Sequence, residues 1–180
     1  MQVQSLVVIG AGPLPELSMR RGTESLAEGL MLPSRTLPVG MSPHVGLQSL
    51  GSESPCLLRL SGDPGRLGPD GQSWLDALGA WRLPTLLLGA PLADGSIPGV
   101  VPAFLALCEN RRVPVLGLAQ LGGAWSPNQR RQDGLPWCGW LGESQDPDAS
   151  AAREALITLL KQRYSRFSSA SATAALTHQP

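Results

Sequence analysis

The chain has 180 residues, of which 42% are hydrophobic and 16% are charged, a composition typical of a globular protein with one substantial core. Its 14 basic and 14 acidic residues cancel, so no field of a single sign is available to hold a nucleic acid backbone or an anionic membrane surface. No apolar run is long enough to span a membrane, and the N-terminal segment lacks the basic start of a signal peptide. We therefore predict a cytoplasmic protein with neither nucleic acid nor membrane among its partners.

The first third of the chain predicts two short strands separated by a helix and a long loop. The β-branched run at 5–9 predicts a strand, and a short helix is expected over 23–30, beginning at Thr23. Prolines, serines and glycines over 31–55 predict an extended loop, which is followed by a second strand at 56–60.

The middle of the chain carries the clearest pattern, a strand–helix–strand unit. Ser73 is a candidate cap for a helix that runs to about Trp81. The apolar runs at 83–90 and 113–120 are typical of strands buried on both faces of a parallel sheet, and 97–112 has helical spacing between them. This unit predicts an α/β protein with a mostly parallel sheet flanked by helices.

The C-terminal part completes the predicted domain. We expect a short strand at 135–141 and an amphipathic helix at 148–166, which together make residues 1–166 a single α/β domain. The small and polar residues 167–180 predict a disordered tail.

The segment VVIGAGPLPE, residues 7–16, is similar to the start of a dinucleotide-binding unit, but it departs from the fingerprint where a phosphate would bind. Gly10 and Gly12 fit G-x-G-x-x-G, whereas Pro15 stands at the third glycine. Pro13 and Pro15 also lack the backbone N–H groups that a phosphate would use. We therefore predict an ordinary turn after the first strand.

Candidate chemistry elsewhere is sparse. Ser42 and His44 with Asp63 or Asp94 form a conceivable hydrolase triad, but no nucleophile elbow accompanies them, and we assign no catalytic residue. Two histidines and three scattered cysteines do not have the spacing of a metal site, so no metal is expected.

Tryptophans and paired arginines form the remaining pattern. The five tryptophans are Trp74, Trp81, Trp125, Trp137 and Trp140. The first two lie two helical turns apart, which favours packing in the core or at an interface. The last three follow the later strands, where an aromatic shelf for a ring-bearing ligand and a dimer interface are both consistent with the pattern. Arg130 and Arg131 nearby are either an anion-binding pair or solvated surface.

From the strand–helix–strand unit onward, the chain resembles the dethiobiotin synthetases, biotin-pathway members of the P-loop ATPase fold. The resemblance is carried by WLDALGAWRLPTLLLGAPLADGSIPGVVPAFLALCENRRVPVLGLAQLGG, by NQRRQDGLPWCGWLGE and by the upstream MSPH, and it spans about 38–165. It implies a shortened P-loop ATPase fold, a homodimer, and a small-molecule ligand near Ser42 and His44. It also implies that Gln120 or Leu121 lies where the family reads adenine.

Several departures from that family concern ATP. The motif G-x-x-x-x-G-K-[ST] is absent, the single lysine is Lys161, and Leu60 or Ser61 stands where the family has an acidic residue. Phosphoryl transfer depends on positioned cations and donors, so losing the loop lysine and the Mg²⁺-binding hydroxyl should cost several orders of magnitude in rate.

Three hypotheses follow from the resemblance and the departures. The first is a degenerate relative without ligase activity, retained for binding or assembly, for which no cofactor is expected. The second is an active synthetase that closes the ureido ring of 7,8-diaminononanoate with CO₂, using Mg²⁺ and ATP at a site without the usual motif. The third is a vestigial product of a shortened gene.

Overall fold

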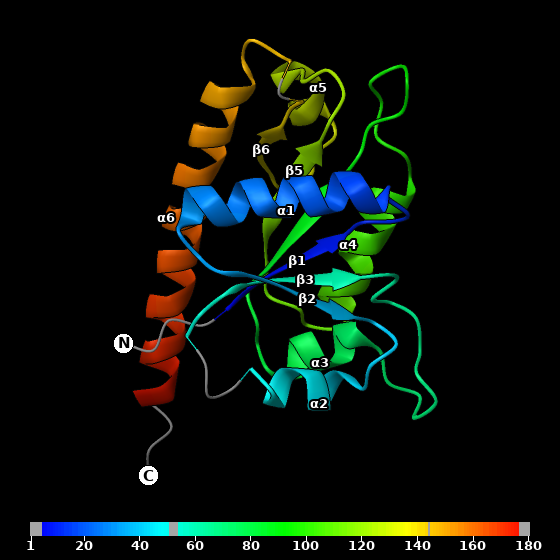
Figure 1. The fold of residues 1–180 in the computed structure, drawn as a ribbon, viewed down its shortest axis with the longest axis vertical. Helices are drawn as coiled ribbons and strands as arrows, with labels where there is room; N and C mark the ends of the chain where they lie inside the picture. The colour runs from blue at the N-terminus through cyan, green and yellow to red at the C-terminus, as the bar shows by residue number, and fades with distance from the viewer. Residues whose placement is uncertain (1–4, 51–53, 144, 177–180) are drawn as a thin grey trace.

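A parallel six-stranded sheet forms the centre of the molecule. The computed structural model of the chain describes residues 5–50, 54–143 and 145–176. The strands, in the spatial order β2-β3-β1-β4-β5-β6, are all parallel (Figure 1). Their bounds are β1 Leu6–Gly10, β2 Ser34–Pro38, β3 Leu57–Ser61, β4 Thr85–Gly89, β5 Val115–Leu121 and β6 Trp137–Leu141. The predicted fold class, an α/β protein with a mostly parallel sheet and flanking helices, is confirmed.

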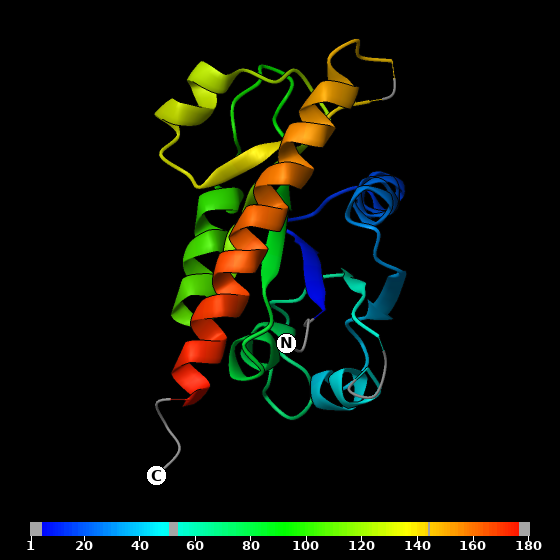
Figure 2. The same cartoon turned by 90° about the vertical axis from the view of Figure 1, so that its left-hand side faces the viewer.

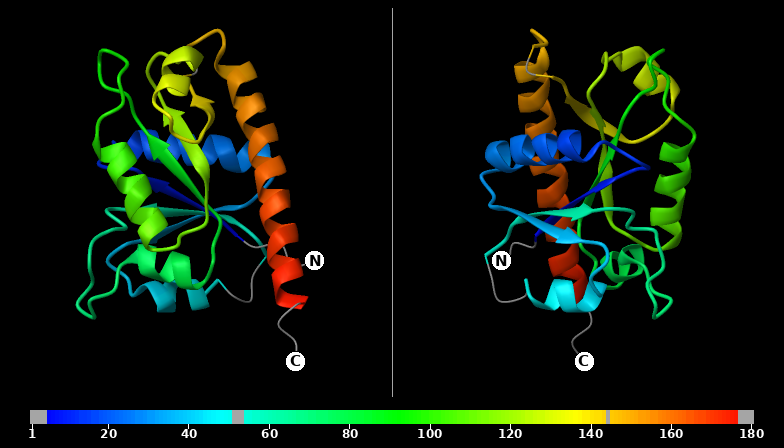
Figure 3. Two further views of the ribbon diagram at one scale, coloured as in Figure 1. Left: turned by 180° about the vertical axis from the view of Figure 1, so that it is seen from behind. Right: turned by 45° about the vertical axis from the view of Figure 1, so that its right-hand side comes forward.

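Among the described residues, five helices connect successive strands and a sixth follows β6, and helices lie on both faces of the sheet. They are α1 Glu16–Leu30, α2 Pro43–Gln48, α3 Trp74–Ala80, α4 Val100–Asn110, α5 Pro127–Gln132 and α6 Ala149–Leu176. Helices α1 and α6 pack on one face, with α1 seen end-on in Figure 2. Helices α3 and α4 lie on the opposite face, which is the nearer one in the left view of Figure 3. None of the helices among the described residues is long and apolar enough to cross a membrane.

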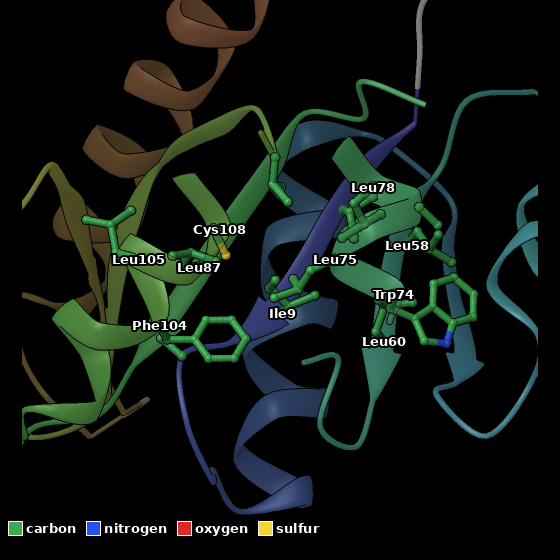
Figure 4. Close-up of a cluster of buried hydrophobic side chains, with 14 of the residues drawn as sticks. Ile9, Leu58, Leu60, Trp74, Leu75, Leu78, Leu87, Phe104, Leu105 and Cys108 are labelled. Carbon is green, nitrogen blue, oxygen red and sulfur yellow. The ribbon is translucent and has the colours of Figure 1, made fainter. Parts of the chain in front are cut away.

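Each face of the sheet has its own hydrophobic core, because alternate strand residues point to opposite sides. Ile9 and Leu87 belong to the core under α3 and α4, together with Trp74 and Phe104 (Figure 4). The residues that alternate with them along the same strands, such as Val8, point to the other face and pack under α1 and α6. Both faces of the central strands are therefore buried, as the continuous apolar runs predicted.

The helix after β1 begins earlier than predicted. Helix α1 starts at Glu16, whereas the sequence predicted a start at Thr23. Thr23 is buried in the middle of the helix, and its hydroxyl donates to the Met19 carbonyl at 2.8 Å. Thr23 lies on the same buried stripe as Met19 and Leu26, so it is a core position and not a cap.

The loop predicted over 31–55 was wrong in its first part. Residues Ser34–Pro38 form the edge strand β2, and Pro43–Gln48 form the short helix α2, while 51–53 lie outside the described residues. Strand β2 is an edge strand that pairs with β3. Its side chains are mostly exposed, so its sequence has no apolar alternation.

At the other end of the chain, α6 continues past residue 166 to Leu176. The last residues of the predicted tail, 177–180, lie outside the described residues.

Candidate ligand-binding site

The turn between β1 and α1 lies at the topological switch point of the sheet, where connections from neighbouring strands run to opposite sides. The chain leaves β1 toward β2 and leaves β4 toward β5, so the crevice expected in an open α/β sheet lies at the carboxyl ends of β1 and β4. The turn itself has few hydrogen-bond donors, because Pro13 lacks an N–H group and so does Pro15, the residue before the helix. Val100 packs against it: a Cβ atom added to Gly12 would lie 2.9 Å from a Val100 methyl carbon.

A cavity of about 1060 Å³ opens beside this turn. Its floor consists of the segments that follow three neighbouring strands, at 90–93, 121–124 and 141–143. Helix α1 contributes one wall, and the first residues of α6 contribute another. The cavity lies outside the carboxyl ends of the strands, where proteins of this architecture bind their ligands.

Cations and hydroxyl groups from α1 and α6 line these walls. Arg21 comes from α1 and Arg153 from α6, and three serines accompany them, Ser18, Ser25 and Ser150. Arg153 donates to Glu28 at 3.2 Å, a carboxylate whose side chain is 76% exposed. Arg21 forms no ion pair within the described part of the chain. Both guanidinium groups are therefore free, or only weakly held, for an incoming anion.

Two carboxylates also line the cavity. Glu143 and Asp146 belong to the connection from β6 to α6, and the Asp146 carboxylate accepts a hydrogen bond from the Glu143 backbone N–H at 3.2 Å. Leu92, Leu121 and Leu141 supply apolar surface. The cavity thus offers guanidinium groups, carboxylates and a hydrocarbon surface within one space.

The two residues predicted to read a nucleotide have different positions. Leu121 lines the cavity. Gln120 is fully buried behind it, and its side-chain amide donates to the carbonyls of Gly122 at 2.8 Å and Ala124 at 3.1 Å. The amide nitrogen of Gln120 therefore holds the shape of the turn after β5 and is not available to a ligand.

Ser42 and His44 lie far from this cavity. They are at the start of α2, beside the edge strand β2, and β2 is separated from β5 by three strands, or about 19 Å at the usual strand spacing. Both ring nitrogens of His44 are occupied. The Trp81 indole N–H donates to Nδ1 at 3.1 Å, which leaves Nε2 as the donor to the Gln72 side-chain oxygen at 3.0 Å.

The three cysteines do not provide a nucleophile. All three are free and buried. Burial raises the pKa of Cys108 to about 12, with a further contribution from Glu109, and burial raises the pKa of Cys138 to about 11 despite the nearby Arg163. Both groups remain thiols at neutral pH. Among the described residues, no three His, Cys, Asp or Glu side chains lie together in a way that could hold a metal ion.

Sequence reasoning did not single out Arg21 or Arg153. They belong to helices that precede and follow most of the sheet, and only folding brings them to one cavity. The sequence signal was weak, because Arg21 precedes the helix predicted at 23–30 and Arg153 is one of several charged residues of the helix predicted at 148–166. No model of a known protein family matches the chain, and no curated protein matches it either. The resemblance to dethiobiotin synthetases therefore stays a prediction.

Proposed function

We propose that the protein binds a small amino carboxylate in the cavity above β4, β5 and β6, and that it does so without transferring a phosphoryl group. The observation that carries this proposal is the composition of the cavity wall. Arg21 and Arg153 suit a carboxylate, and Glu143 and Asp146 suit an ammonium group. Between such charged ends, the leucine side chains suit a short hydrocarbon chain.

The absence of phosphoryl transfer is supported by the turn after β1. A phosphate at that position needs converging backbone N–H groups and a cation. Two of the backbone positions are prolines, and the only lysine of the chain is Lys161, on α6. The protein is then a degenerate relative of the dethiobiotin synthetases that retains a ligand site, and 7,8-diaminononanoate is the ligand that the resemblance implies.

Isothermal titration calorimetry with 7,8-diaminononanoate tests the proposal. Nonanoate, which lacks the ammonium groups, should bind at least tenfold more weakly. Arg21→Gln should weaken binding of the diamino acid about tenfold, because a charge-assisted hydrogen bond is lost. Arg20→Gln is the matched control, since Arg20 is exposed on the same helix and pairs with Glu24 at 3.8 Å.

Addition of Mg²⁺ and ATP distinguishes this proposal from the alternative hypothesis of an active synthetase. We expect no change in melting temperature with Mg-ATP and no release of ADP in the presence of the diamino acid and bicarbonate. Nucleotide-dependent stabilisation accompanied by ADP release would overturn the proposal and would identify the protein as an active ligase. If wild type and Arg21→Gln bind the diamino acid equally well, the assignment of the ligand to this cavity is wrong.

A further inference from the structure

A second cavity, of about 530 Å³, lies along the outer edge of β6. Strand β6 ends the sheet, so one of its sides has no neighbouring strand. The cavity is lined by residues of α5, by the turn at 134–136, by the first half of β6 and by Arg163 of α6. It shares no lining residue with the larger cavity.

The wall of this second cavity carries excess positive charge. Three arginines line it, Arg130, Arg131 and Arg163. Asp133, beside Arg130 at 3.1 Å, is the carboxylate that pairs with one of them. Arg131 donates to the neutral side chain of Asn128, and Arg163 donates to the Leu116 carbonyl at 2.6 Å. Three guanidinium groups and one carboxylate leave a net charge of +2, which favours an anion.

Arg130 provides a second, independent indication of a ligand. Its residue surface is only 4% exposed, and one terminal nitrogen donates to the Gly95 carbonyl at 2.6 Å. The other terminal nitrogen, Nη1, has no acceptor among the described residues, and Nε faces Asp133 outside hydrogen-bond geometry. A buried donor without an acceptor is costly, and because Nη1 is itself closed off from solvent, a ligand oxygen would remove that cost once the Arg130 guanidinium turns toward the cavity.

Two tryptophans give the cavity an aromatic surface. The rings of Trp125 and Trp137 meet edge to face, with centroids 6.3 Å apart and an angle of 80° between their planes. The Arg130 guanidinium carbon lies 5.4 Å from the centre of the Trp137 ring. This arrangement places a planar hydrophobic surface directly beside the cations.

We propose that this cavity is a binding site for a planar aromatic carboxylate. The ring of the ligand packs against Trp125 and Trp137. Its carboxylate accepts hydrogen bonds from Arg131 and, once the Arg130 guanidinium turns toward the ligand, from Nη1 of Arg130. The site is separate from the one assigned to the amino carboxylate, and it does not depend on it.

Nuclear magnetic resonance of the indole N–H groups tests this site directly, with benzoate as the probe. The signals of Trp125 and Trp137, assigned with Trp→Phe variants, should shift on titration with millimolar benzoate. Those of Trp74 and Trp81, which lie on α3 and directly after it, should stay in place. Benzamide has the ring without the charge, and cyclohexanecarboxylate has the charge without the planar ring. Each should bind about tenfold more weakly than benzoate.

Substitution of Arg131, the exposed member of the arginine pair, completes the test. Arg131 is chosen because Arg130 is buried, and Arg130→Gln would disturb the packing around it. Arg131→Gln should weaken benzoate binding about tenfold, and Arg166→Gln, at an exposed position of α6 outside the cavity, should leave it unchanged. The proposal is overturned if benzoate shifts neither Trp125 nor Trp137, if benzamide binds as well as benzoate, or if Arg131→Gln binds like wild type.

Discussion

The two ends of the sheet differ in how their polar side chains find partners. Around β2 and β3 several charged and polar groups have partners within the protein. Arg59, buried on β3, donates to Glu16 at 2.6 Å, Asp76 accepts from Ser73 and Arg111, and His44 lies between Trp81 and Gln72. Such closed networks stabilise the fold and leave little for a ligand to contact.

Around β4, β5 and β6 the polar side chains that line the cavities have fewer partners within the protein. The two cavities described above lie there. Within the described residues Arg21 has no ion pair, Arg153 pairs with an exposed carboxylate, and Arg131 and Arg163 donate to neutral groups, whereas Arg130 lies beside Asp133 and keeps Nη1 without an acceptor. Ser42 and His44 of the MSPH segment lie in the first region, the structural end around β2, β3 and α2. The arginines of α1, α5 and α6 line the cavities of the second region, the proposed binding end around β4, β5 and β6.

The largest expected effect comes from the core of the structural end. Trp74 is 1% exposed and its indole N–H donates to the Val39 carbonyl at 3.2 Å. Trp74→Ala should lower the free energy of unfolding by about 4 kcal/mol, because it removes a large buried side chain and leaves a void. Urea denaturation measures the change.

Trp81→Ala is the matched control, since Trp81 directly follows the same helix and is 37% exposed. It should cost about 1 kcal/mol. If the two variants lose equal stability, the described packing of α3 against the sheet is contradicted.

These two tryptophans show which features of the fold could be predicted from the sequence and which could not. The spacing of apolar residues and the Ser73 cap predicted α3, and its capping box with Asp76 is present in the structure. The strands β1, β3, β4, β5 and β6 were predicted because each is a run of apolar residues. Spacing could not tell that Trp74 is buried while Trp81 is half-exposed, because that depends on the neighbouring α2.

The candidate sites were harder to predict for a physical reason. Strand β2 has exposed, polar side chains, so no pattern distinguishes it from a loop. The larger cavity forms from turns and helices that are distant in sequence, and its arginines, Arg21 and Arg153, have no local signature. The second cavity is lined mostly by residues between 125 and 139, where the paired arginines Arg130 and Arg131 were already a candidate for anion binding. The aromatic shelf was predicted at the carboxyl end of the strands, yet Trp137 is the first residue of β6 and Trp140 is buried. The predicted homodimer stays a prediction.

The next effect in size is the acid response of the structural end. Hydrogen bonds from Ser73, and then the Arg111 guanidinium, lower the pKa of Asp76 below its usual 3.8. Because the pKa is lower in the folded protein, the stabilisation by Asp76 is complete above about pH 4 and is lost as the pH falls through the folded value. The free energy of unfolding of wild type should therefore exceed that of Asp76→Asn at neutral pH, and the difference should shrink in acid.

Ser73→Ala sharpens this test, since it removes the largest cause of the shift while leaving the carboxylate. It should cost about 1 kcal/mol at neutral pH through the lost cap, and it should flatten the dependence of stability on acid pH. A difference between wild type and Asp76→Asn that is the same at neutral and acid pH would show that Asp76 is not held by these partners.

An effect no larger than that of Ser73→Ala is expected for Ser42 and His44, and it tests which end of the molecule binds the ligand. Ser42 makes no capping hydrogen bond, and the hydrogen bonds of His44 are to partly exposed side chains. The double variant Ser42→Ala with His44→Ala should cost about 1 kcal/mol in the free energy of unfolding. It should bind 7,8-diaminononanoate as well as wild type, whereas Arg21→Gln should not. If calorimetry instead shows that the double variant loses the ligand and Arg21→Gln keeps it, the binding end of the molecule is at β2. The occupied nitrogens of His44 would then have to exchange their protein partners for the ligand.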